Sequence, residues 1–341
     1  MNKTVLITGI NGQDGALLAD FLLKKGYFVV GTFRRGTQPK FWRLEELKIL
    51  NKIKCVGLDL SDSITLLKLL DDYNPSEIYH LAGDSFVADS YHNPKSSLLN
   101  NIEHTINLLE AIRYRNSKCW CFVPSSSEIF AGTEKDILTE EDYPLTMSPY
   151  GLSKFVNLQI SEMYRKIYKL RIASGILFNH ESSLRSRSFV TRKITYNLVR
   201  LKINPNSPML LGNLNTSRDW SSAEDFIKAM ALLGEKDKVG SYIFSSGKLT
   251  SLREFIKITC EKVGFDIYFD GQGLDEKVID KKTGNILCKV SKNYFRISDT
   301  KGKIGSTKKL KFETNWEPKI SIEGMIEKMV EKDLERRLNG K

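Results

Sequence analysis

The sequence predicts an α/β fold in which a doubly wound parallel sheet carries helices on both faces. Short apolar stretches at residues 5–8, 28–33, 55–58, 77–81, 119–123 and 172–178 have the length of buried strands. Amphipathic helical patterns follow the first of them and also cover residues 62–73, 98–113 and 150–168. Strict alternation of strands and helices is typical of a parallel sheet built from βαβ units.

The alternation stops after residue 178, and a chain of 341 residues is long enough for two lobes. We therefore expect residues 1–178 to form a Rossmann-type domain and residues 179–341 to form mainly a smaller, mixed α/β domain. Within the second part, residues 270–293 are rich in Gly, Lys and Asp and are expected to form a long loop. Apolar residues from 322 to 334 recur at helical spacing and predict a final amphipathic helix with its stripe in the core.

Composition narrows the class of protein. The net charge is +11, but the lysines are spread through every segment among Asp and Glu, which favours a solvated basic surface over a nucleic-acid site. This charge also favours an anionic nucleotide substrate. No apolar run is long enough for a membrane span, and the first residues lack a signal peptide's apolar block, so we expect a cytoplasmic protein without membrane contact. Five scattered cysteines without a CxxC pair predict no metal site.

The first predicted strand runs into TGINGQDG, which predicts a dinucleotide site. Its glycines, Gly9, Gly12 and Gly15, lie between strand and helix, where the backbone can approach a pyrophosphate at the helix N-terminus. The turn also contains Asn11, Gln13 and Asp14, which we include in the site.

The end of the second strand indicates which cofactor binds. It reads GTFRR, without the acid that usually holds the ribose of NAD. Arg34 and Arg35 suit a 2′-phosphate instead, and we predict NADP, the alternative being two surface arginines. Asp59, after the third strand, suits either the adenine amine or a plain turn.

The stretch from residue 125 to residue 154 carries the predicted chemistry. Tyr150 and Lys154 are one helical turn apart, so the ammonium stabilises a phenolate that can take a proton from a sugar hydroxyl. Ser126 and Glu128, at a strand end, supply a second acid–base centre, which indicates more than simple oxidation. Taken alone, Glu128 is equally consistent with a strand-end cap.

Together, TGINGQDG, SSSE and the YxxxK pair resemble the extended short-chain dehydrogenase/reductases, and within them the GDP-mannose 4,6-dehydratase family. The likeness continues through residues 176–195, 210–230 and 294–296. It implies a Rossmann lobe, rejoined by about residues 212–240, and a smaller lobe that binds a GDP-sugar. It also implies an NADP-dependent lyase that removes water from GDP-mannose, or a related GDP-hexose, to give the 4-keto-6-deoxy sugar. A homo-oligomer, dimer or tetramer, is expected.

The resemblance assigns roles position by position. Ser126 takes the place of the catalytic threonine, Glu128 that of the catalytic glutamate, and Tyr150 and Lys154 those of the catalytic pair. The remaining implied cofactor contacts are Asp59, Leu60, Leu81, Ala82, Ser85, His180 and Arg185. The implied substrate contacts are Ser85, Asn179, Arg192, Lys193, Arg218 and Arg296, although Arg218 with Asp219 also suits a structural ion pair.

The chain departs from the family pattern beside the expected sugar. Asp84 replaces a glutamine and Phe86 a histidine, so GDP-N-acetylglucosamine and GDP-heptose stay open as substrates. An epimerase or reductase of the same superfamily would use Tyr150 and Lys154 but would need no carboxylate at Glu128. A regulatory protein that binds the cofactor without turnover would typically lack the YxxxK pair.

Overall fold

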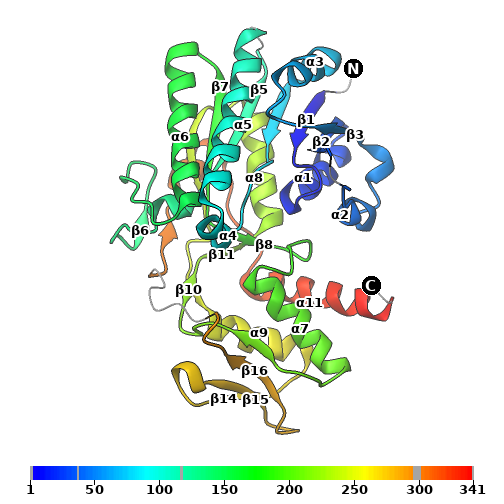
Figure 1. Cartoon of the computed structure of the whole chain (residues 1–341), viewed down its shortest axis with the longest axis vertical. Coiled ribbons are helices and arrows are strands. Elements are labelled where there is room, and N and C mark those ends of the chain that lie inside the picture. The colour runs from blue at the N-terminus through cyan, green and yellow to red at the C-terminus, as the bar shows by residue number, and fades with distance from the viewer. Residues whose placement is uncertain (1–2, 37, 116–117, 295–300, 340–341) are drawn as a thin grey trace. The chain divides into compact units, whose positions relative to one another are not determined.

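The computed structural model describes residues 3–36, 38–115, 118–294 and 301–339 (Figure 1). The chain divides into two compact units. The first unit comprises Met1–Phe178, Ala223–Phe244 and Gly305–Glu317. The second unit comprises Asn179–Ser222, Ser245–Ile304 and Pro318–Lys341.

The first unit contains a seven-stranded sheet in the order β12-β7-β5-β4-β1-β2-β3. Its strands are β1 (Thr4–Thr8), β2 (Phe28–Arg34), β3 (Lys54–Leu58), β4 (Glu77–His80), β5 (Trp120–Ser126), β7 (Arg171–Leu177) and β12 (Gly240–Phe244). All neighbours pair in parallel, which confirms the predicted doubly wound sheet. The order reverses between β1 and β4, and ligands of such sheets bind beyond the strand ends at this switch point.

Helices cover both faces of this sheet. They are α1 (Gln13–Lys24), α2 (Trp42–Glu46), α3 (Ser63–Tyr73), α4 (Val87–His92), α5 (Pro94–Tyr114), α6 (Pro149–Tyr168), α8 (Ala223–Glu235) and α10 (Lys308–Thr314). Short elements complete the unit: η1 (Leu50–Lys52), η2 (Ser127–Phe130) and β6 (Ile137–Leu138). On one face, α3, α5 and α6 share a buried leucine-rich cluster with Cys121 and Val123 of β5. On the other, Phe226 of α8 and Phe122 of β5 both contact Phe244 of β12, as the alternation of side chains along β5 requires.

The second unit has a small mixed sheet and three packed helices. Its four-stranded sheet has the order β14-β15-β16-β9, formed by β14 (Ile267–Asp270), β15 (Lys277–Asp280), β16 (Ile286–Val290) and β9 (Met209–Leu211). Two further pairs join β8 (Asn179–Glu181) to β11 (Trp220–Ser222) and β10 (Ser217–Arg218) to β13 (Thr250–Ser251). The helices are α7 (Val190–Ile203), α9 (Leu252–Val263) and α11 (Ile322–Leu338), with the 3-10 turn η3 (Gly273–Asp275). The chain leaves this unit through β17 (Ile304–Gly305).

The expected long loop at residues 270–293 is wrong. Strands β15 and β16 pair antiparallel there, with Val278 opposite Cys288, and both side chains are buried. Gly284 lies in the intervening turn with φ +70°, a conformation that favours glycine. Most of the glycines, lysines and aspartates lie in the turns or are at least partly exposed, although Asp280 of β15 is buried. They outweigh strands of only four and five residues in the composition.

The predicted C-terminal helix is confirmed as α11, whose Met325, Ile326, Met329 and Val330 lie in the core of the second unit. Two boundaries in the first unit differ from prediction by three or more residues. Helix α5 begins at Pro94, because proline suits the first helical turn, where its missing N–H costs no hydrogen bond. Strand β5 continues to Ser126, because that residue still pairs with β7.

Candidate active site

The glycine-rich turn lies at the switch point of the sheet. Gly9 has φ +72°, and a Cβ atom there would lie 2.8 Å from both the Ala82 nitrogen and the Leu81 oxygen. A Cβ on Gly15 would overlap the Gly9 oxygen, so the first turn of α1 lies directly against the strand end. The closely packed turn therefore presents backbone N–H groups at a helix N-terminus, a geometry that suits a pyrophosphate.

Thr8 and His80 fix the loop that follows β4. The Thr8 hydroxyl accepts a hydrogen bond from the Ala82 N–H at 3.0 Å and lies 3.0 Å from His80 Nδ1. His80 is completely buried, and this desolvation, followed by the charge of Lys154, lowers its pKa to about 3. His80 is therefore neutral, and its ring holds Thr8, and through it Ala82, next to Gly9.

The ends of β2 and β3 place the residues predicted for the adenosine half of the cofactor. Arg34 and Arg35 are exposed at the end of β2, and the Arg35 N–H bonds the Leu58 oxygen at 3.2 Å. Asp59 is exposed and accepts the Ser61 N–H at 3.0 Å, so it forms the turn that the alternative interpretation required. The next residue, Leu60, is buried.

Arg43 is a residue of this region that the sequence did not reveal. Its Nη1 donates to the Asn11 oxygen of the glycine-rich turn at 2.8 Å, and its guanidinium lies 4.5 Å from the Trp42 ring. Helix α2 thus brings a further guanidinium to the turn. No motif marks this position, because the contact joins two residues that are 32 positions apart.

The two predicted acid–base centres lie at the same edge of the sheet. Ser126 ends β5, and its hydroxyl accepts the Glu128 N–H at 3.3 Å at the start of η2. Ser148 caps α6 by accepting the Gly151 N–H at 3.0 Å. A Cβ on Gly151 would lie 2.7 Å from the Glu128 oxygen, so the Glu128 backbone is packed against the residue that follows Tyr150.

Tyr150 and Lys154 are both buried on the inner side of α6. Lys154 Nζ lies 5.8 Å from the centroid of the Tyr150 ring and donates to the Pro124 oxygen at 3.4 Å. Burial lowers the pKa of Lys154 to about 8, and the negative charge of Asp84 opposes this shift. A partly desolvated ammonium beside a phenol is an arrangement that favours the phenolate.

A buried polar network, also missed from the sequence, ties α5 to α6. Asn101 Oδ1 accepts the Asp84 N–H at 3.0 Å, and Asn101 Nδ2 donates to the Ser153 hydroxyl at 3.1 Å. The Ser153 hydroxyl donates to the backbone carbonyl oxygen of Tyr150 at 2.8 Å, and Asn157 Nδ2 donates to the backbone carbonyl oxygen of Asn101 at 3.1 Å. Polar residues on an otherwise buried helix face were the available signal.

Three of the predicted site residues lie near the start of the second unit. Asn179 and His180 lie in β8, and His180 is buried opposite Ser221. Arg185 lies 3.5 Å from the centroid of the Phe189 ring, with its Nε 3.2 Å from the Glu181 carboxylate.

Two more of the predicted cations lie on α7 and β10. Lys193 Nζ lies 3.8 Å over the Tyr294 ring, and Arg218 donates to the Ser217 oxygen at 2.8 Å. Asp219 accepts hydrogen bonds from the N–H groups of Ser246 and Gly247 at 2.8 and 2.9 Å, so it organises a turn of its own unit. Arg296 lies outside the described residues.

Arg192 does not fit its predicted role in binding substrate. Its side chain is 2% exposed and forms an ion pair with Asp333 of α11, while its Nε donates to the Ser183 oxygen at 3.2 Å. Thr195 donates to the same carboxylate at 2.9 Å. Asp333 also accepts a hydrogen bond from Arg336 at 3.2 Å, so the carboxylate is shared by two guanidinium groups. Because Arg192 is buried and its ion pair joins α7 to α11, we assign it a structural role.

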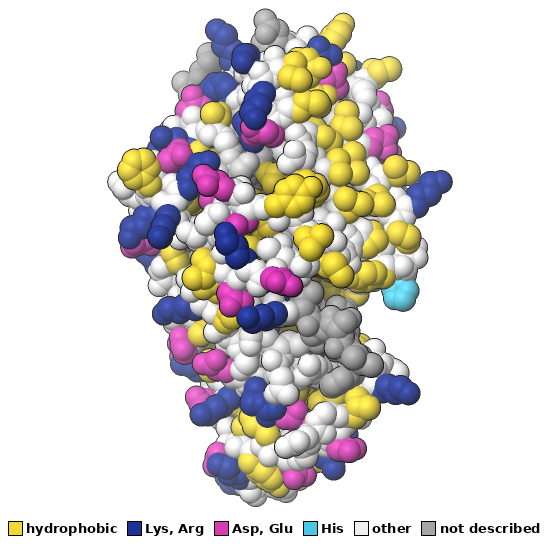
Figure 2. Space-filling view, turned by 90° about the vertical axis from the view of Figure 1, so that its left-hand side faces the viewer, with side chains coloured by type: hydrophobic (Ala, Val, Ile, Leu, Met, Phe, Trp, Pro, Cys, Tyr) yellow, Lys and Arg dark blue, Asp and Glu magenta, His cyan; other side chains and the backbone are white. Residues whose placement is uncertain are grey.

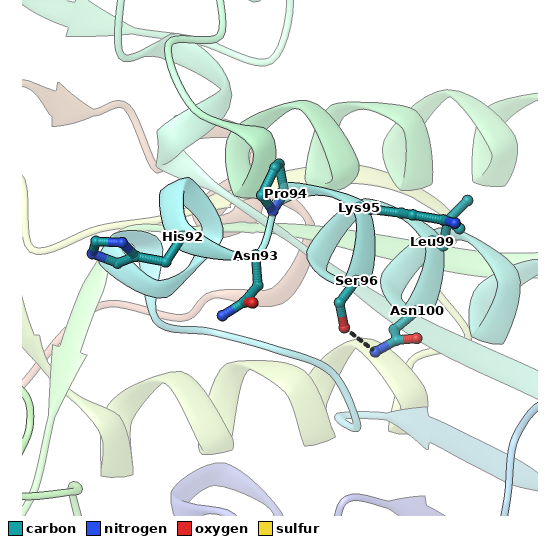
Figure 3. A pocket seen from close by; sticks show the side chains of 7 residues that line it. All are labelled: His92, Asn93, Pro94, Lys95, Ser96, Leu99 and Asn100. Carbon is teal, nitrogen blue, oxygen red and sulfur yellow. Dashed lines mark hydrogen bonds between the residues drawn. The ribbon is translucent and has the colours of Figure 1, made fainter.

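A surface pocket at the junction of α4 and α5 contains none of the predicted site residues (Figure 3). It is lined by His92, Asn93, Pro94, Lys95, Ser96, Leu99 and Asn100. Asn100 donates to the Ser96 hydroxyl at 3.1 Å, which turns both polar groups toward each other. Among the described residues, no helix has the length and apolarity of a membrane span, and no group of three His, Cys, Asp or Glu side chains is arranged to bind a metal.

Comparison with known proteins identifies the family. The profile described as GDP-mannose 4,6 dehydratase matches residues 6–329. The chain belongs to the GDP-mannose 4,6-dehydratase family. A GDP-mannose 4,6-dehydratase of Vibrio cholerae serotype O1 is 35% identical over 98% of this chain and 95% of its own length. GDP-mannose 4,6 dehydratase 2 of Caenorhabditis elegans is 35% identical over 97% of this chain and 89% of its own.

Solved structures share the fold of this family member. UDP-glucose 4-epimerase of Thermotoga maritima, solved with UDP-glucose, has a TM-score of 0.81 at 20% identity and covers 98% of this chain and 99% of its own. RMD of Pseudomonas aeruginosa, solved with NADPH, has a TM-score of 0.77 at 20% identity and covers 98% and 100%. A Thermus thermophilus epimerase with the same fold was solved with NAD, with a TM-score of 0.80 at 20% identity and coverage of 97% and 98%. The fold thus accommodates nicotinamide cofactors of both kinds.

Proposed function

We propose that the protein is an NADP-dependent lyase that removes water from GDP-mannose and forms the GDP-4-keto-6-deoxy sugar. The observation that carries the proposal is that the Glu128 backbone packs against Gly151 of α6, so that Ser126 and Glu128 lie at the same sheet edge as Tyr150 and Lys154. We assign each of these two pairs as an acid–base centre. A plain oxidoreductase needs only the second of them. The relatives that carry the name GDP-mannose 4,6-dehydratase support the same substrate. The cytoplasmic location expected from the sequence is part of this proposal.

The proposed steps use each side chain for one proton. Tyr150, as phenolate, takes the proton from O4 of the hexose, and Lys154 stabilises the phenolate charge. When bound, the nicotinamide would supply the hydride acceptor for C4 and the hydride donor for C6, so the reaction would have no net redox change. The 4-ketone makes the C5 proton acidic, and Glu128 removes it. Glu128 then gives this proton to the C6 hydroxyl, which leaves as water, while Ser126 donates a hydrogen bond. As C6 regains a hydride, C5 regains a proton, which balances the one that Tyr150 took from O4.

The choice of NADP over NAD rests on the charges near the ribose. Arg34 and Arg35 are exposed at the end of β2, where an NAD site usually carries an acid. The glycine-rich turn, in which a Cβ on Gly9 or Gly15 would collide with backbone, fits a pyrophosphate. Asp59, Leu60, Leu81, Ala82 and Ser85, with Asn11, Gly12, Gln13 and Asp14, complete the proposed cofactor contacts of the first unit.

We assign the nucleotide sugar mainly to the second unit. Lys193 and Arg218 supply positive charge for a diphosphate, and Asn179 supplies an amide. His180 and Arg185 are proposed to contact the cofactor, and Arg296, like Ser85, is assigned to the substrate on the family resemblance alone. Arg192 is left out because its side chain is buried and paired with Asp333.

We further propose that the protein forms a homo-oligomer through the outer face of α6. Leu152, Met163 and Ile167 recur along that helix and are between 41% and 63% exposed, and Leu99 on α5 is 52% exposed. Figure 2 shows hydrophobic side chains gathered on one part of the face that it presents. The mass by light scattering should exceed that of one chain, and Ile167→Lys should lower it toward the monomer; a monomeric wild-type protein would refute this.

The decisive experiment offers the protein NADP+ with a panel of nucleotide sugars and measures the product mass. Loss of one water from GDP-mannose supports the proposal, whereas the same loss from GDP-N-acetylglucosamine or a GDP-heptose would reassign the substrate. A product of unchanged mass would indicate an epimerase. Glu128→Gln should slow water loss by about 10²–10⁴-fold and leave removal of hydride from C4 detectable. Glu134→Gln, which removes an exposed carboxylate beyond η2, is the matched control.

A further inference from the structure

The loop after β4 passes directly over the ammonium group of Lys154. Gly83 in this loop has φ +152°, and a Cβ atom there would lie 2.7 Å from Asn101 Oδ1 and 3.9 Å from Lys154 Nζ. Position 83 thus has no room for a side chain, and the next residue, Asp84, is exposed, with a negative charge that acts on the buried amine. Asp84 is one of the places where the chain departs from the family pattern.

Both backbone groups of Asp84 are held by one side chain. Its N–H donates to Asn101 Oδ1 at 3.0 Å, and its oxygen accepts from Asn101 Nδ2 at 3.4 Å. The same Nδ2 donates to Ser153, the neighbour of Lys154, at 3.1 Å. Asn101 and Ser153 lie on helices α5 and α6, which pack against each other. These helices therefore fix the position of the Asp84 backbone relative to Lys154.

Few charges in the described part of the chain face Lys154. Tyr150 lies on the same helix, and His80, from β4, is neutral because its burial lowers its pKa to about 3. Burial lowers the pKa of His104 of α5 as well, and the charge of Asp84 is one of several that act on it in the opposite direction. Asp84 is the group whose charge raises the pKa of Lys154, against the burial that lowers it to about 8. A buried ammonium without such a carboxylate loses its proton more readily.

We propose that Asp84 is a positioning residue whose carboxylate keeps Lys154 protonated at the pH of the reaction. This inference rests on the proposed function for its consequence in catalysis, since a neutral amine would no longer stabilise the Tyr150 phenolate. The pH above which activity falls is then set by the loss of the Lys154 proton, which the Asp84 carboxylate delays. The glutamine of the family pattern is one methylene longer than Asp84 and has no charge, so it would not hold that limit.

The direct test measures the protonation of Lys154 without substrate. In protein labelled with 13C at lysine Cε, the Lys154 signal is identified by its loss in Lys154→Met. Asp84→Asn should lower its titration midpoint by about 0.5–1 pH unit, the size expected for a partly solvated charge pair. The difference should shrink in about 1 M salt. Asp84→Gln should give the same shift, and Asp89→Asn, which removes an exposed carboxylate from α4, should give none.

The activity profile provides the second readout. At about pH 8, dehydration by Asp84→Asn should be about two- to fivefold slower than wild type, and near pH 6 the two should agree. An unshifted Lys154 signal in Asp84→Asn and Asp84→Gln, or an equal shift in Asp89→Asn, overturns the inference. A wild-type protein that dehydrates no GDP-sugar, with the signal still shifted in Asp84→Asn, overturns the proposed function and leaves the charge pair standing.

Discussion

Replacing Gly9 by alanine should damage the switch point more than the same change at a glycine of similar backbone conformation. Gly9 has φ +72° and Gly26, after α1, has φ +82°, so alanine is strained at both. That strain costs about 1–2 kcal/mol. A Cβ at Gly26 meets nothing within 4 Å, whereas at Gly9 it would lie 2.8 Å from the backbone of Leu81 and Ala82. Such crowding adds about 1–3 kcal/mol, for a total of about 2–5 kcal/mol at Gly9.

The backbone of Ala82 cannot move away freely, because its N–H is bonded to the Thr8 hydroxyl. The free energy of unfolding, measured in urea, should therefore fall by about 1–3 kcal/mol more in Gly9→Ala than in Gly26→Ala. Affinity for NADPH, followed by its fluorescence, should fall in Gly9→Ala and stay unchanged in Gly26→Ala. Equal losses of stability and equal affinities in the two variants would refute the reasoning, since only the contact with residues 81 and 82 distinguishes them.

Three further changes test other parts of the structure. Replacing both Arg34 and Arg35 by serine should weaken NADPH binding about tenfold or more, as expected for lost charge-assisted hydrogen bonds, and leave NADH binding unchanged. Asp333→Asn leaves Arg192 buried without its counter-charge and should lower the free energy of unfolding by about 3–5 kcal/mol. His80 has its pKa lowered from 6.5 to about 3 by folding, so it contributes stability above pH 6.5 that is lost as the pH falls toward 3. His80→Gln should make the unfolding free energy less steep in this window, by up to about 1.4 kcal/mol per pH unit.

Each of these changes has an exposed counterpart as a control. Lys40→Ser removes a cation after β2 and should leave the preference for NADPH intact. Asp275→Asn removes a carboxylate of the second unit and should cost less than about 0.5 kcal/mol. His92→Gln removes an exposed imidazole and should leave the pH dependence of unfolding unchanged. A control variant that changes the measured cofactor affinity, unfolding free energy or pH dependence as much as its test variant would contradict the corresponding interpretation.

Much of the fold follows from local patterns, because each βαβ unit is encoded by a short, continuous stretch of sequence. Apolar runs of four to seven residues separated by amphipathic helices were sufficient for six of the seven strands of the parallel sheet. The seventh, β12, lies beyond residue 178 and was not predicted, because the alternation of strands and helices is interrupted before it. The β15–β16 hairpin was missed because its two short strands gain their burial from the core of the second unit, which residues distant in sequence supply. Composition alone therefore favoured a loop there.

The candidate site divides in the same way. Local sequence was enough to predict the glycine-rich turn, Ser126 with Glu128, and Tyr150 with Lys154, since each set falls within one turn or one strand end. The folded chain was needed to show that Arg192 pairs with a residue 141 positions away, that Arg43 reaches the glycine-rich turn, and that Asn101 holds the backbone of Asp84. Such contacts join side chains through space, and their free energy depends on burial and partner charge, which no local spacing encodes.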